Sequence, residues 1–526
     1  MGSAGGRRFN AGRHAGVLVP LFSIPSRRSW GIGELPDLVP LSRWLESAGF
    51  DFVQFLPLNE MQEGQSSPYS ALSAMAIDPI FIAVEDVHEW VVAGDDALSS
   101  EEQAALEEVR SAARVDYGVV RALKNRALRR AFDWFADHVW GTGDRRDRGL
   151  REFEERERWW LDDYSLFRAL HDESGGRHWR EWEPGLRDRD PSALDEARRR
   201  LEWPVRYYAY LQWIADEQWQ RARMEASPVG VFGDFPFMVS GHSADVWARQ
   251  HDFDLDCSVG TPPDAFSATG QDWGLPAYRW DVVAAGGYGW LRARTRRSSD
   301  LYDGFRIDHL IGFYRTFVRR VDGSNGFVPL DEPAQRHQGE QLLSVFGEGG
   351  ASLIGEDLGT VPDFLRVSLA ERGIPGMKVM RWERNWHADG HPFHDVTGYR
   401  DASVATSGTH DTETMAEWWD SAPVHERQAV LSLPVMCDAG LSPEAPFSDH
   451  TRDALLDVLF ASGSRLLILP IQDVFGWRDR INTPALVNDQ NWTWRLAGPV
   501  EGLMTDSGAA ERARFLHSLS QKYGRS

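Results

Sequence analysis

One short stretch, residues 303–309 (DGFRIDH), constrains the fold of this chain more than any other. Read as a β-strand, it places Arg306 and Asp308 on one face and its apolar residues on the other. A guanidinium and a carboxylate on one face of a buried strand are costly unless they pair or act on something. The pattern by itself fits an internal salt bridge or a half-exposed edge strand as well as a functional site.

Two further apolar stretches also end in ionisable residues. Residues 351–359 (ASLIGEDLG) run into Glu356 and Asp357, and residues 402–411 (ASVATSGTHD) run into His410 and Asp411. Strands that finish in this way are typical of the rim of a (β/α)8 barrel, where catalytic groups lie at the carboxyl ends of the strands. We therefore expect these stretches to bring their charged side chains to one rim.

The remaining chain supplies the other strands of such a barrel. Two apolar segments flank an amphipathic helix expected at 36–48, which is the pattern of a βαβ unit with a parallel sheet. The sequence predicts an α/β fold, a (β/α)8 TIM barrel with large, mainly helical insertions between barrel strands. No strand-rich segment follows the last strand, so no C-terminal β-sandwich is expected. The expected strands are 16–22, 52–57, 229–236, 303–309, 351–359, 376–380, 402–411 and 464–473.

The helical insertion divides the chain into three expected parts. Residues 1–83 begin the catalytic barrel with its first two strands, 84–228 form a mainly helical insertion, and 229–526 complete the barrel with loop insertions. Ser99 and Glu102 form a capping box that opens the helical region. Apolar residues then recur at helical spacing, as at Leu106, Val109, Leu123 and Phe132.

Several motifs resemble those of a known family. FRIDH, GEDLG and SGTHD resemble the catalytic strands of the amylomaltases, the 4-α-glucanotransferases related to the α-amylases. SSPYSALS at 66–73, SADVWA at 243–248 and PPDAFSATGQDWG at 262–274 match further segments of that family, and the last is long and specific. The resemblance runs from about residue 16 to 496 and is weakest in the helical insertion.

The resemblance implies transfer of α-1,4-glucan segments between maltooligosaccharides, starch or glycogen, with retention of configuration. It implies that Asp308 is the nucleophile, Glu356 the acid/base and Asp411 a third acid that grips the sugar as it distorts. Arg306 is expected to lower the pKa of Asp308 and keep it ionised, whereas a dry pocket would keep Glu356 protonated. Further glucan-binding residues implied are Arg306, His410, Asp234, Tyr69, Ser67, Trp273 and Trp30, the aromatic ones as an acceptor platform.

The sequence also departs from the family pattern. The family commonly continues DHFRGF where this chain has Leu310 and Ile311, and GNPLY where it has Leu275. A basic residue and an amide near the groove are therefore missing. These departures leave the catalytic assignment in place and bear on substrate length and acceptor preference.

Composition and charge exclude some classes of partner. The net charge of −22 argues against nucleic acid or an anionic membrane, which need basic surfaces, and it suits an uncharged glucan donor and acceptor. The N-terminus has no apolar signal core and no apolar run is long enough to span a membrane. Cys257 and Cys437 form no CxxC motif, so we expect reduced thiols in a cytoplasmic protein. No cofactor or metal is expected, and monomer and homodimer are both open.

Other functions fit some of the same residues. An amylase-type α-glucan hydrolase would use the same carboxylates, with water in place of the sugar acceptor. A metal-dependent hydrolase could use Asp308, His309, His410 and Asp411 as ligands, although no HxH or HExxH motif occurs. A third alternative is a glucan-binding protein without catalysis, but the presence of all three carboxylates argues against it.

Overall fold

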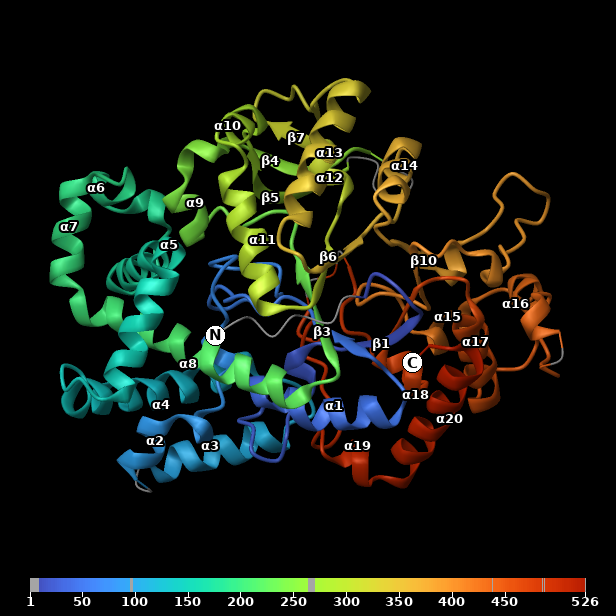
Figure 1. The fold of residues 1–526 in the computed structure, drawn as a ribbon, viewed down its shortest axis with the longest axis horizontal. Coiled ribbons are helices and arrows are strands. Elements are labelled where there is room, and N and C mark those ends of the chain that lie inside the picture. Colours follow the sequence, from blue (N-terminus) through green and yellow to red (C-terminus); the bar gives the residue numbers. More distant parts are fainter. Residues whose placement is uncertain are drawn as a thin grey trace.

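A closed barrel of eight parallel strands forms the centre of the computed structural model, which describes residues 9–94, 98–263, 270–437, 439–484, 486 and 488–525 (Figure 1). Its strands are joined in chain order, and the last strand pairs with the first. This confirms the predicted (β/α)8 barrel. The barrel strands are β1 (His14–Leu18), β2 (Phe52–Gln54), β3 (Gly230–Phe235), β6 (Gly304–Ile307), β9 (Ser352–Gly355), β10 (Gly376–Val379), β11 (Ser403–Thr406) and β12 (Leu466–Pro470).

Large rings fill the lower layer of the barrel against glycines of the neighbouring strands. Phe52 of β2 is paired with Gly16 of β1, and Phe232 of β3 with Gly304 of β6. A Cβ atom at Gly16 would lie 2.5 Å from the Phe52 ring, and one at Gly304 would lie 2.3 Å from the Phe232 ring. Side chains of β6 alternate in direction, so Gly304 and Arg306 share the inner face. Gly304 therefore leaves space for the Phe232 ring in the layer of the barrel below Arg306.

The segment between β2 and β3 is helical. Ser99 caps its second helix by accepting from the Glu102 N–H at 3.2 Å, and Glu102 accepts from the Ser99 N–H at 2.7 Å, which confirms the capping box. Figure 1 shows these helices together on the left of the barrel. They are α2 (His88–Ala93), α3 (Ser100–Ser111), α4 (Tyr117–His138), α5 (Arg145–Glu173), α6 (Pro184–Arg187), α7 (Pro191–Arg200) and α8 (Glu202–Ala226).

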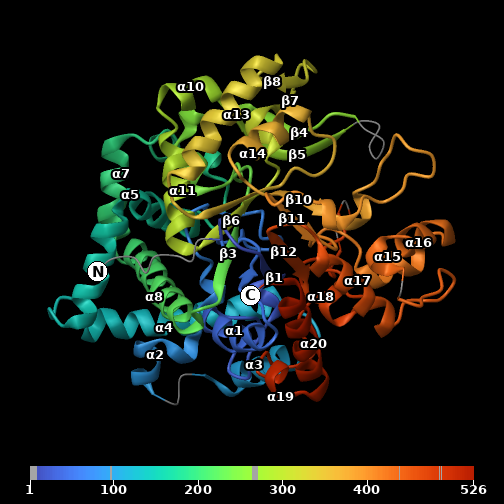
Figure 2. The same ribbon diagram turned by 45° about the vertical axis from the view of Figure 1, so that its right-hand side comes forward.

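A four-stranded antiparallel sheet in the order β5-β4-β7-β8 was not predicted. It lies at the top of Figures 1 and 2, and it is built from segments on both sides of β6. In the expected division of the chain these segments belong to the loop insertions of the barrel, and no strand is predicted for them. The strands are β4 (Phe253–Thr261), β5 (Gln271–Tyr278), β7 (Thr316–Arg320) and β8 (Gly326–Val328).

Helices cover the outside of the barrel, and α1 (Leu38–Ser47) confirms the predicted first helix. After β12 the described residues form only helices, so the expected absence of a C-terminal β-sandwich holds for that part of the chain. The remaining helices are α9 (Ala244–Ala248), α10 (Trp280–Ala285), α11 (Gly289–Leu301), α12 (Ile311–Tyr314), α13 (Glu332–Gly347), α14 (Asp363–Glu371), α15 (Met415–Ser421), α16 (Val424–Leu431), α17 (Asp449–Ala461), α18 (Ile471–Phe475), α19 (Gly502–Thr505) and α20 (Ser507–Tyr523).

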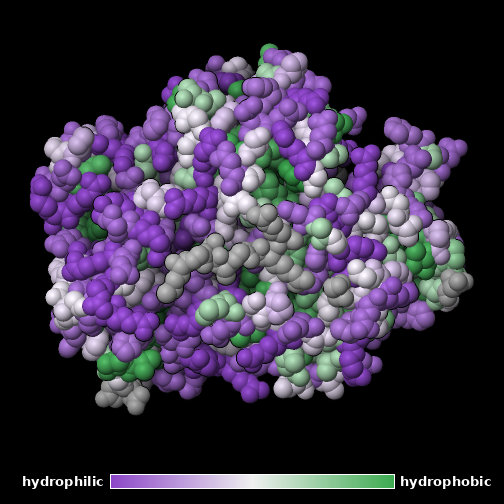
Figure 3. All heavy atoms as spheres, in the orientation of Figure 1, coloured by the Kyte–Doolittle hydropathy of each residue, from purple (hydrophilic) through white to green (hydrophobic). Residues whose placement is uncertain are grey.

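The face of the molecule drawn in Figure 3 is mainly hydrophilic. Figure 3 shows one face on which apolar residues form only small patches. None of the helices in the described part of the chain has both the length and the apolar character needed to cross a membrane.

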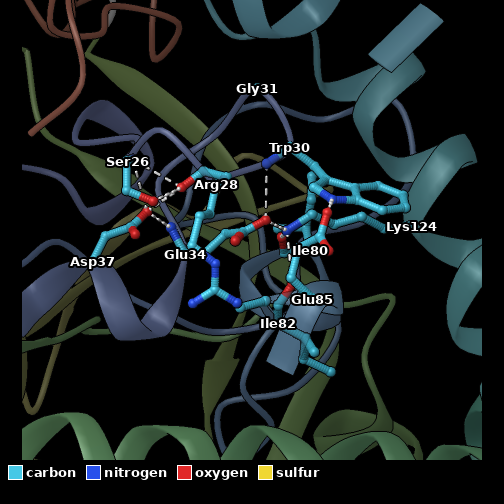
Figure 4. A network of polar contacts seen from close by, with 12 residues as sticks. Ser26, Arg28, Trp30, Gly31, Glu34, Asp37, Ile80, Ile82, Glu85 and Lys124 are labelled. Atoms are coloured by element: carbon cyan, nitrogen blue, oxygen red, sulfur yellow. Dashed lines mark hydrogen bonds and ion pairs between the residues drawn. The ribbon is translucent and has the colours of Figure 1, made fainter. Parts of the chain in front are cut away.

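A buried ion pair joins the first barrel loop to the helical region (Figure 4). The Lys124 ammonium on α4 lies 2.6 Å from the Glu34 carboxylate, and the two side chains are 1% and 2% exposed. Lys124 also donates to the carbonyls of Ile80 and Ile82, at 2.6 and 2.8 Å. Glu34 in turn accepts from the Trp30 N–H at 3.0 Å. Because the two buried charges come from different segments and stabilise each other, the pair fixes how α4 packs against the first barrel loop.

Removing one member of this pair should destabilise the protein strongly. We expect Lys124→Met to lower the free energy of unfolding by about 3–5 kcal/mol, because Glu34 would remain buried without a partner. Glu34→Gln in the same chain should recover part of the loss. Lys522→Met is the matched control, since its pair with Asp457 is largely exposed, and it should change stability by about 1 kcal/mol or less.

Urea unfolding followed by far-ultraviolet circular dichroism measures both changes. Equal effects of Lys124→Met and Lys522→Met would show that the buried pair does not hold the two regions together.

Candidate active site

The candidate catalytic side chains gather at the carboxyl ends of the barrel strands. Asp308 directly follows β6 and Glu356 directly follows β9, whereas Asp411 lies on the loop after β11. Parallel strands of a barrel all end on one side, so residues far apart in sequence meet there. The structure brings together six of the residues singled out in the sequence: Asp234, Arg306, Asp308, Glu356, His410 and Asp411.

Arg306 lies at the centre of this group. Its guanidinium donates to both oxygens of Asp234, at 3.0 and 2.8 Å, and to Asp308 Oδ1 at 2.8 Å. The Arg306 Nη1 atom also lies 3.7 Å from Glu356 Oε2. Arg306 is only 5% exposed, and burial by itself would lower its pKa. The surrounding carboxylates outweigh this effect and hold the pKa of Arg306 well above its usual value. The predicted pairing of Arg306 with Asp308 on one strand face is confirmed.

The protonation of Asp308 differs from the expectation. Burial raises the pKa of Asp308 to about 6, and Arg306 offsets only part of this rise. The positive charge therefore acts in the expected direction, but removal from water outweighs it. A group with a pKa of about 6 is still mainly ionised at pH 7. A quarter of the Asp308 side chain, 25%, remains exposed, which leaves the carboxylate accessible.

Glu356 is held by the backbone of His309. His309 adopts a left-handed conformation with φ of 44°, which is uncommon for a residue other than glycine. Its N–H donates to Glu356 Oε2 at 2.6 Å. Burial raises the pKa of Glu356, although Arg306 and this N–H both act to lower it. Since both contacts are made to Oε2, the other oxygen is the one placed to carry a proton.

The neighbouring Asp357 belongs to a different environment. Its carboxylate accepts from the Met377 N–H at 2.7 Å, at the start of β10, and lies 3.6 Å from Arg366. It makes no contact with Arg306 in the described structure. Of the two adjacent carboxylates, Glu356 is thus the one that faces Asp308 across the arginine.

Neighbouring side chains keep the Asp411 carboxylate ionised. Burial acts to raise its pKa, but the ion pair with His410 at 3.2 Å and a hydrogen bond from Asn482 at 2.6 Å hold the pKa well below its usual value. Burial acts to lower the pKa of His410, but the negative charge of Asp411 raises it by more, so the net shift is upward. The Asp411 side chain is 45% exposed, and its carboxylate is therefore an accessible charged group.

Tyr69 links the two halves of the site. Its hydroxyl donates to Asp234 Oδ2 at 2.6 Å, accepts from Arg306 at 3.1 Å and lies 3.2 Å from His410 Nε2. Its ring stacks on the His410 imidazole with centroids 5.5 Å apart. Ser67 does not reach the carboxylates in the described contacts. Its side chain accepts from the Tyr69 N–H at 3.4 Å and so shapes the turn that carries the tyrosine.

The two predicted tryptophan contacts differ in position. Trp273 on β5 is half-buried, and its ring lies 5.0 Å from the His309 ring, next to Asp308. Residues 264–269 of the long family motif lie outside the described residues. Trp30 is 1% exposed, packs against Trp90 and donates from its indole nitrogen to Glu85 at 3.1 Å. Figure 4 shows Trp30 in the network around Lys124. The predicted sugar contact by Trp30 is therefore wrong, because burial in this network leaves no ring face for a sugar.

Two residues of the site were missed. Asn482 donates to Asp411, and the ring of Trp492 lies 5.8 Å from Tyr69 and 5.7 Å from His410. Both follow the last barrel strand, where the chain reads NTP and NWTW. Polar and aromatic residues at the same end of the barrel as the carboxylates were the available signal.

The arrangement can hold one carboxylate ionised and another protonated on either side of a single cation. In the part of the chain that the structure describes, no three His, Cys, Asp or Glu side chains are grouped as metal ligands would be. The fold and the site together define the class of TIM-barrel enzymes, with buried carboxylates gathered at the carboxyl ends of the barrel strands.

Comparison with known proteins identifies the family. A family model for 4-α-glucanotransferase matches residues 19–501. The chain is 34% identical to a 4-α-glucanotransferase of Thermus thermophilus over 95% of this chain and 98% of that protein. It is 31% identical to one of Chlamydia pneumoniae over 93% and 92%. The amylomaltase from Streptococcus agalactiae, solved in complex with acarbose, superimposes with a TM-score of 0.81 at 26% identity, covering 98% of this chain and all (100%) of that one. The chain belongs to the 4-α-glucanotransferase family.

Replacement of the central arginine tests the site. We expect Arg306→Lys to reduce glucanotransferase activity by about 100-fold or more, because a single ammonium cannot donate to Asp234 in a bidentate manner while it pairs with Asp308. Arg292→Lys is the matched control, since Arg292 forms an exposed bidentate pair with Glu348, and it should retain nearly full activity. Product formation from maltotriose measures both. An Arg306→Lys enzyme with a third of the original activity would contradict the central role of this residue.

Proposed function

We propose that the chain transfers α-1,4-glucan segments between maltooligosaccharides, starch or glycogen by a retaining double displacement. Asp308 acts as nucleophile, Glu356 as acid/base and Asp411 as the group that stabilises the transition state. The observation that carries this proposal is the single buried guanidinium shared by the two carboxylates. It lies at 2.8 Å from Asp308 and at 3.7 Å from Glu356.

In the first step, the Asp308 carboxylate attacks the anomeric carbon of the donor. The bond from that carbon to the glycosidic oxygen breaks, and the oxygen takes the proton of Glu356 as the first product leaves. The result is a glucosyl ester on Asp308 and an ionised Glu356. The raised pKa of Glu356 favours the protonated form that this step needs.

In the second step, Glu356 removes the proton of an acceptor hydroxyl. The hydroxyl oxygen attacks the anomeric carbon, and Asp308 leaves as a carboxylate. Two inversions at the same carbon restore the original configuration. The site returns to its starting protonation state.

Asp411 and its neighbours are placed to bind the hydroxyls of the reacting sugar. The Asp411 carboxylate is open to the pocket, charged, and oriented by His410 and Asn482. Hydrogen bonds to the sugar hydroxyls become stronger as the sugar ring distorts. They therefore lower the activation barrier of glycosyl transfer. Tyr69 and Asp234 fix His410 and Arg306, so we assign them to positioning of these groups as well as to the sugar.

Sugar acceptor and water compete for the ester on Asp308. Transfer requires that a bound acceptor be held in position, for which effective molarities of about 10⁵ M or more are attainable. Trp273 is our candidate for the acceptor platform, because its ring lies beside His309 at the entrance to the carboxylates. The alternative, an amylase-type hydrolase, would have the same carboxylates without this platform.

We also place the protein in the cytoplasm. Cys257 and Cys437 are both free thiols, as is usual for proteins of a reducing compartment. α-1,4-Glucan donors and sugar acceptors are the proposed partners.

The product pattern from maltotriose tests the proposed function. A transferase should yield glucose together with maltopentaose and longer chains, with almost no net gain in reducing ends. Asp308→Asn should lose nearly all turnover, and Trp273→Ala should raise the ratio of hydrolysis to transfer more than it lowers consumption of maltotriose. Chromatography by chain length and a reducing-end assay provide the two readings. Reducing ends that rise in step with maltotriose loss would identify a hydrolase.

The pH dependence of the reaction tests the roles of the carboxylates. Asp308 must be ionised, so kcat/KM should fall as the pH drops below about 6, the pKa to which burial raises this group. Glu356 must be protonated, so activity should also fall as the pH rises through its raised pKa. Glu356→Gln should remove the alkaline limb and keep the acidic one. An acidic limb near the ordinary aspartate value of about 4 would mean that Arg306 outweighs burial at Asp308.

A further inference from the structure

A cavity of about 830 Å³ has a lining different from the group of candidate catalytic carboxylates, although one of its residues, Asp479, also lines a small pocket with His410. It is bounded by the loop 25–31 that precedes α1, by the turn 110–114 between α3 and α4, and by residues 494–499 near the C-terminus. Asp308, Glu356 and Asp411 are not among the described residues that line it. The volume falls in the range of about 300–1,000 Å³ typical of small-molecule sites.

Hydrogen bonds between the three bounding segments fix the walls of this cavity. The Arg495 guanidinium donates to the carbonyls of Gly31, Val109 and Arg110, at 3.1, 3.0 and 2.9 Å. Arg110 donates in turn to the carbonyls of Ser29 and Arg28, at 3.1 and 2.9 Å. Figure 4 shows the same loop joined by hydrogen bonds to Glu34 and Asp37. Walls that are already ordered add little to the entropic cost of binding a ligand.

The charge of the lining is opposite to that of the whole protein. Four arginines, Arg27, Arg110, Arg114 and Arg495, line the cavity with a single carboxylate, Asp479. The chain as a whole carries a net charge of −22. Bonds from Arg110, Arg114 and Arg495 to main-chain carbonyls do not neutralise these cations. Among the four cavity arginines, Arg110 alone forms an ion pair with an acid of the described residues, Glu85 at 3.5 Å. Like charges gathered in this way favour an anionic ligand.

Arg27 is the arginine best placed to meet such a ligand. Its main-chain N–H donates to the Glu501 carboxylate at 3.2 Å, which anchors the backbone. Its guanidinium is exposed and makes no hydrogen bond or ion pair to the part of the chain that the structure describes. A guanidinium with all its donors available matches the geometry of a phosphate group.

An aromatic surface lies beside these cations. Trp477 is half-buried, and its ring stacks on Phe475 with centroids 4.4 Å apart and an angle of 7° between planes. The ring of Trp494 lies 5.8 Å from it and completes the aromatic wall. Flat rings of this kind pack against the apolar C–H face of a pyranose, with polar groups around the edge.

We propose that this cavity is a second ligand site and that it binds a phosphorylated sugar. The phosphate is bound by the arginines, with Arg27 as the principal donor, and the sugar ring packs on Trp477. An unmodified glucan would leave the clustered positive charges without a counter-charge. Inorganic phosphate would leave the aromatic wall unused. Only a ligand with both parts uses both features of the lining.

Binding of glucose 6-phosphate tests this proposal, with ³¹P line broadening as the measurement. Excess maltotriose is present throughout to occupy the catalytic groove. Glucose 6-phosphate should broaden in a saturable manner, and inorganic phosphate should bind about tenfold more weakly. Arg27→Glu should weaken binding of glucose 6-phosphate by about tenfold or more, because a charge-assisted contact becomes a repulsion. Arg145→Glu, at an exposed position at the start of α5, should leave it unchanged.

Trp477→Leu separates the sugar contact from the phosphate contact. It should weaken binding of glucose 6-phosphate and leave that of inorganic phosphate unchanged, with circular dichroism as the check on folding. Three results would overturn the proposal: equal effects of Arg27→Glu and Arg145→Glu, displacement of glucose 6-phosphate by maltose, or equal affinity for glucose 6-phosphate and inorganic phosphate. None of these readings depends on turnover, so failure here is distinct from failure of the proposed transferase function.

Discussion

The buried guanidinium of Arg306 is the interaction on which the rest of the site depends. A charge this far from water is tolerable only where opposite charges and hydrogen bonds compensate it. Asp234 provides the bidentate partner and Tyr69 accepts a further bond, so the arginine is fixed before any substrate is considered. Asp308 and Glu356 are then positioned relative to it. The floor of phenylalanine rings and glycines below the arginine keeps this layer at a constant height in the barrel.

One cation can support two opposite protonation states because its distances to the two carboxylates differ. The Arg306–Asp308 contact is 2.8 Å, and the Arg306–Glu356 contact is 3.7 Å. Coulombic stabilisation of a negative charge falls with distance, so the ionised form is favoured more at Asp308 than at Glu356. Burial raises the pKa of both groups. The arrangement therefore favours different protonation states at two neighbouring carboxylates, which is what the proposed roles of nucleophile and acid require.

Charge is also distributed unevenly over the molecule. Excess acid makes the protein as a whole anionic, yet the cavity between the first barrel loop, α3 and the C-terminal segment is lined mainly by arginines. The first barrel loop takes part in both the buried network with Lys124 and the wall of this cavity. The helical region is thus attached to the barrel through a loop that also shapes a candidate ligand site.

Local patterns in the sequence determined the barrel and its catalytic rim. Strands such as 303–309 and 351–359 are recognisable because a run of apolar residues ends in carboxylates, and parallel strands must deliver such ends to one side. The antiparallel sheet that carries Trp273 escaped prediction, because its strands come from segments on both sides of β6 and their pairing is set by the tertiary structure. Asn482 and Trp492 were recognisable as polar and aromatic residues after the last strand, but their contacts with Asp411 and His410 were set by the tertiary structure.

Only the tertiary structure determined which side chains are buried. Burial in turn determined the role of Trp30 and the pKa of Asp308. Trp30 packs against Trp90 and is therefore not available as a sugar contact. Burial also raises the pKa of Asp308 above the value that its neighbouring arginine alone would give. Whether a side chain is dry depends on contacts from distant parts of the chain, here including the helical region between β2 and β3. The sequence determines which groups stand at the strand ends, and the packing of the whole chain determines how strongly each holds its proton.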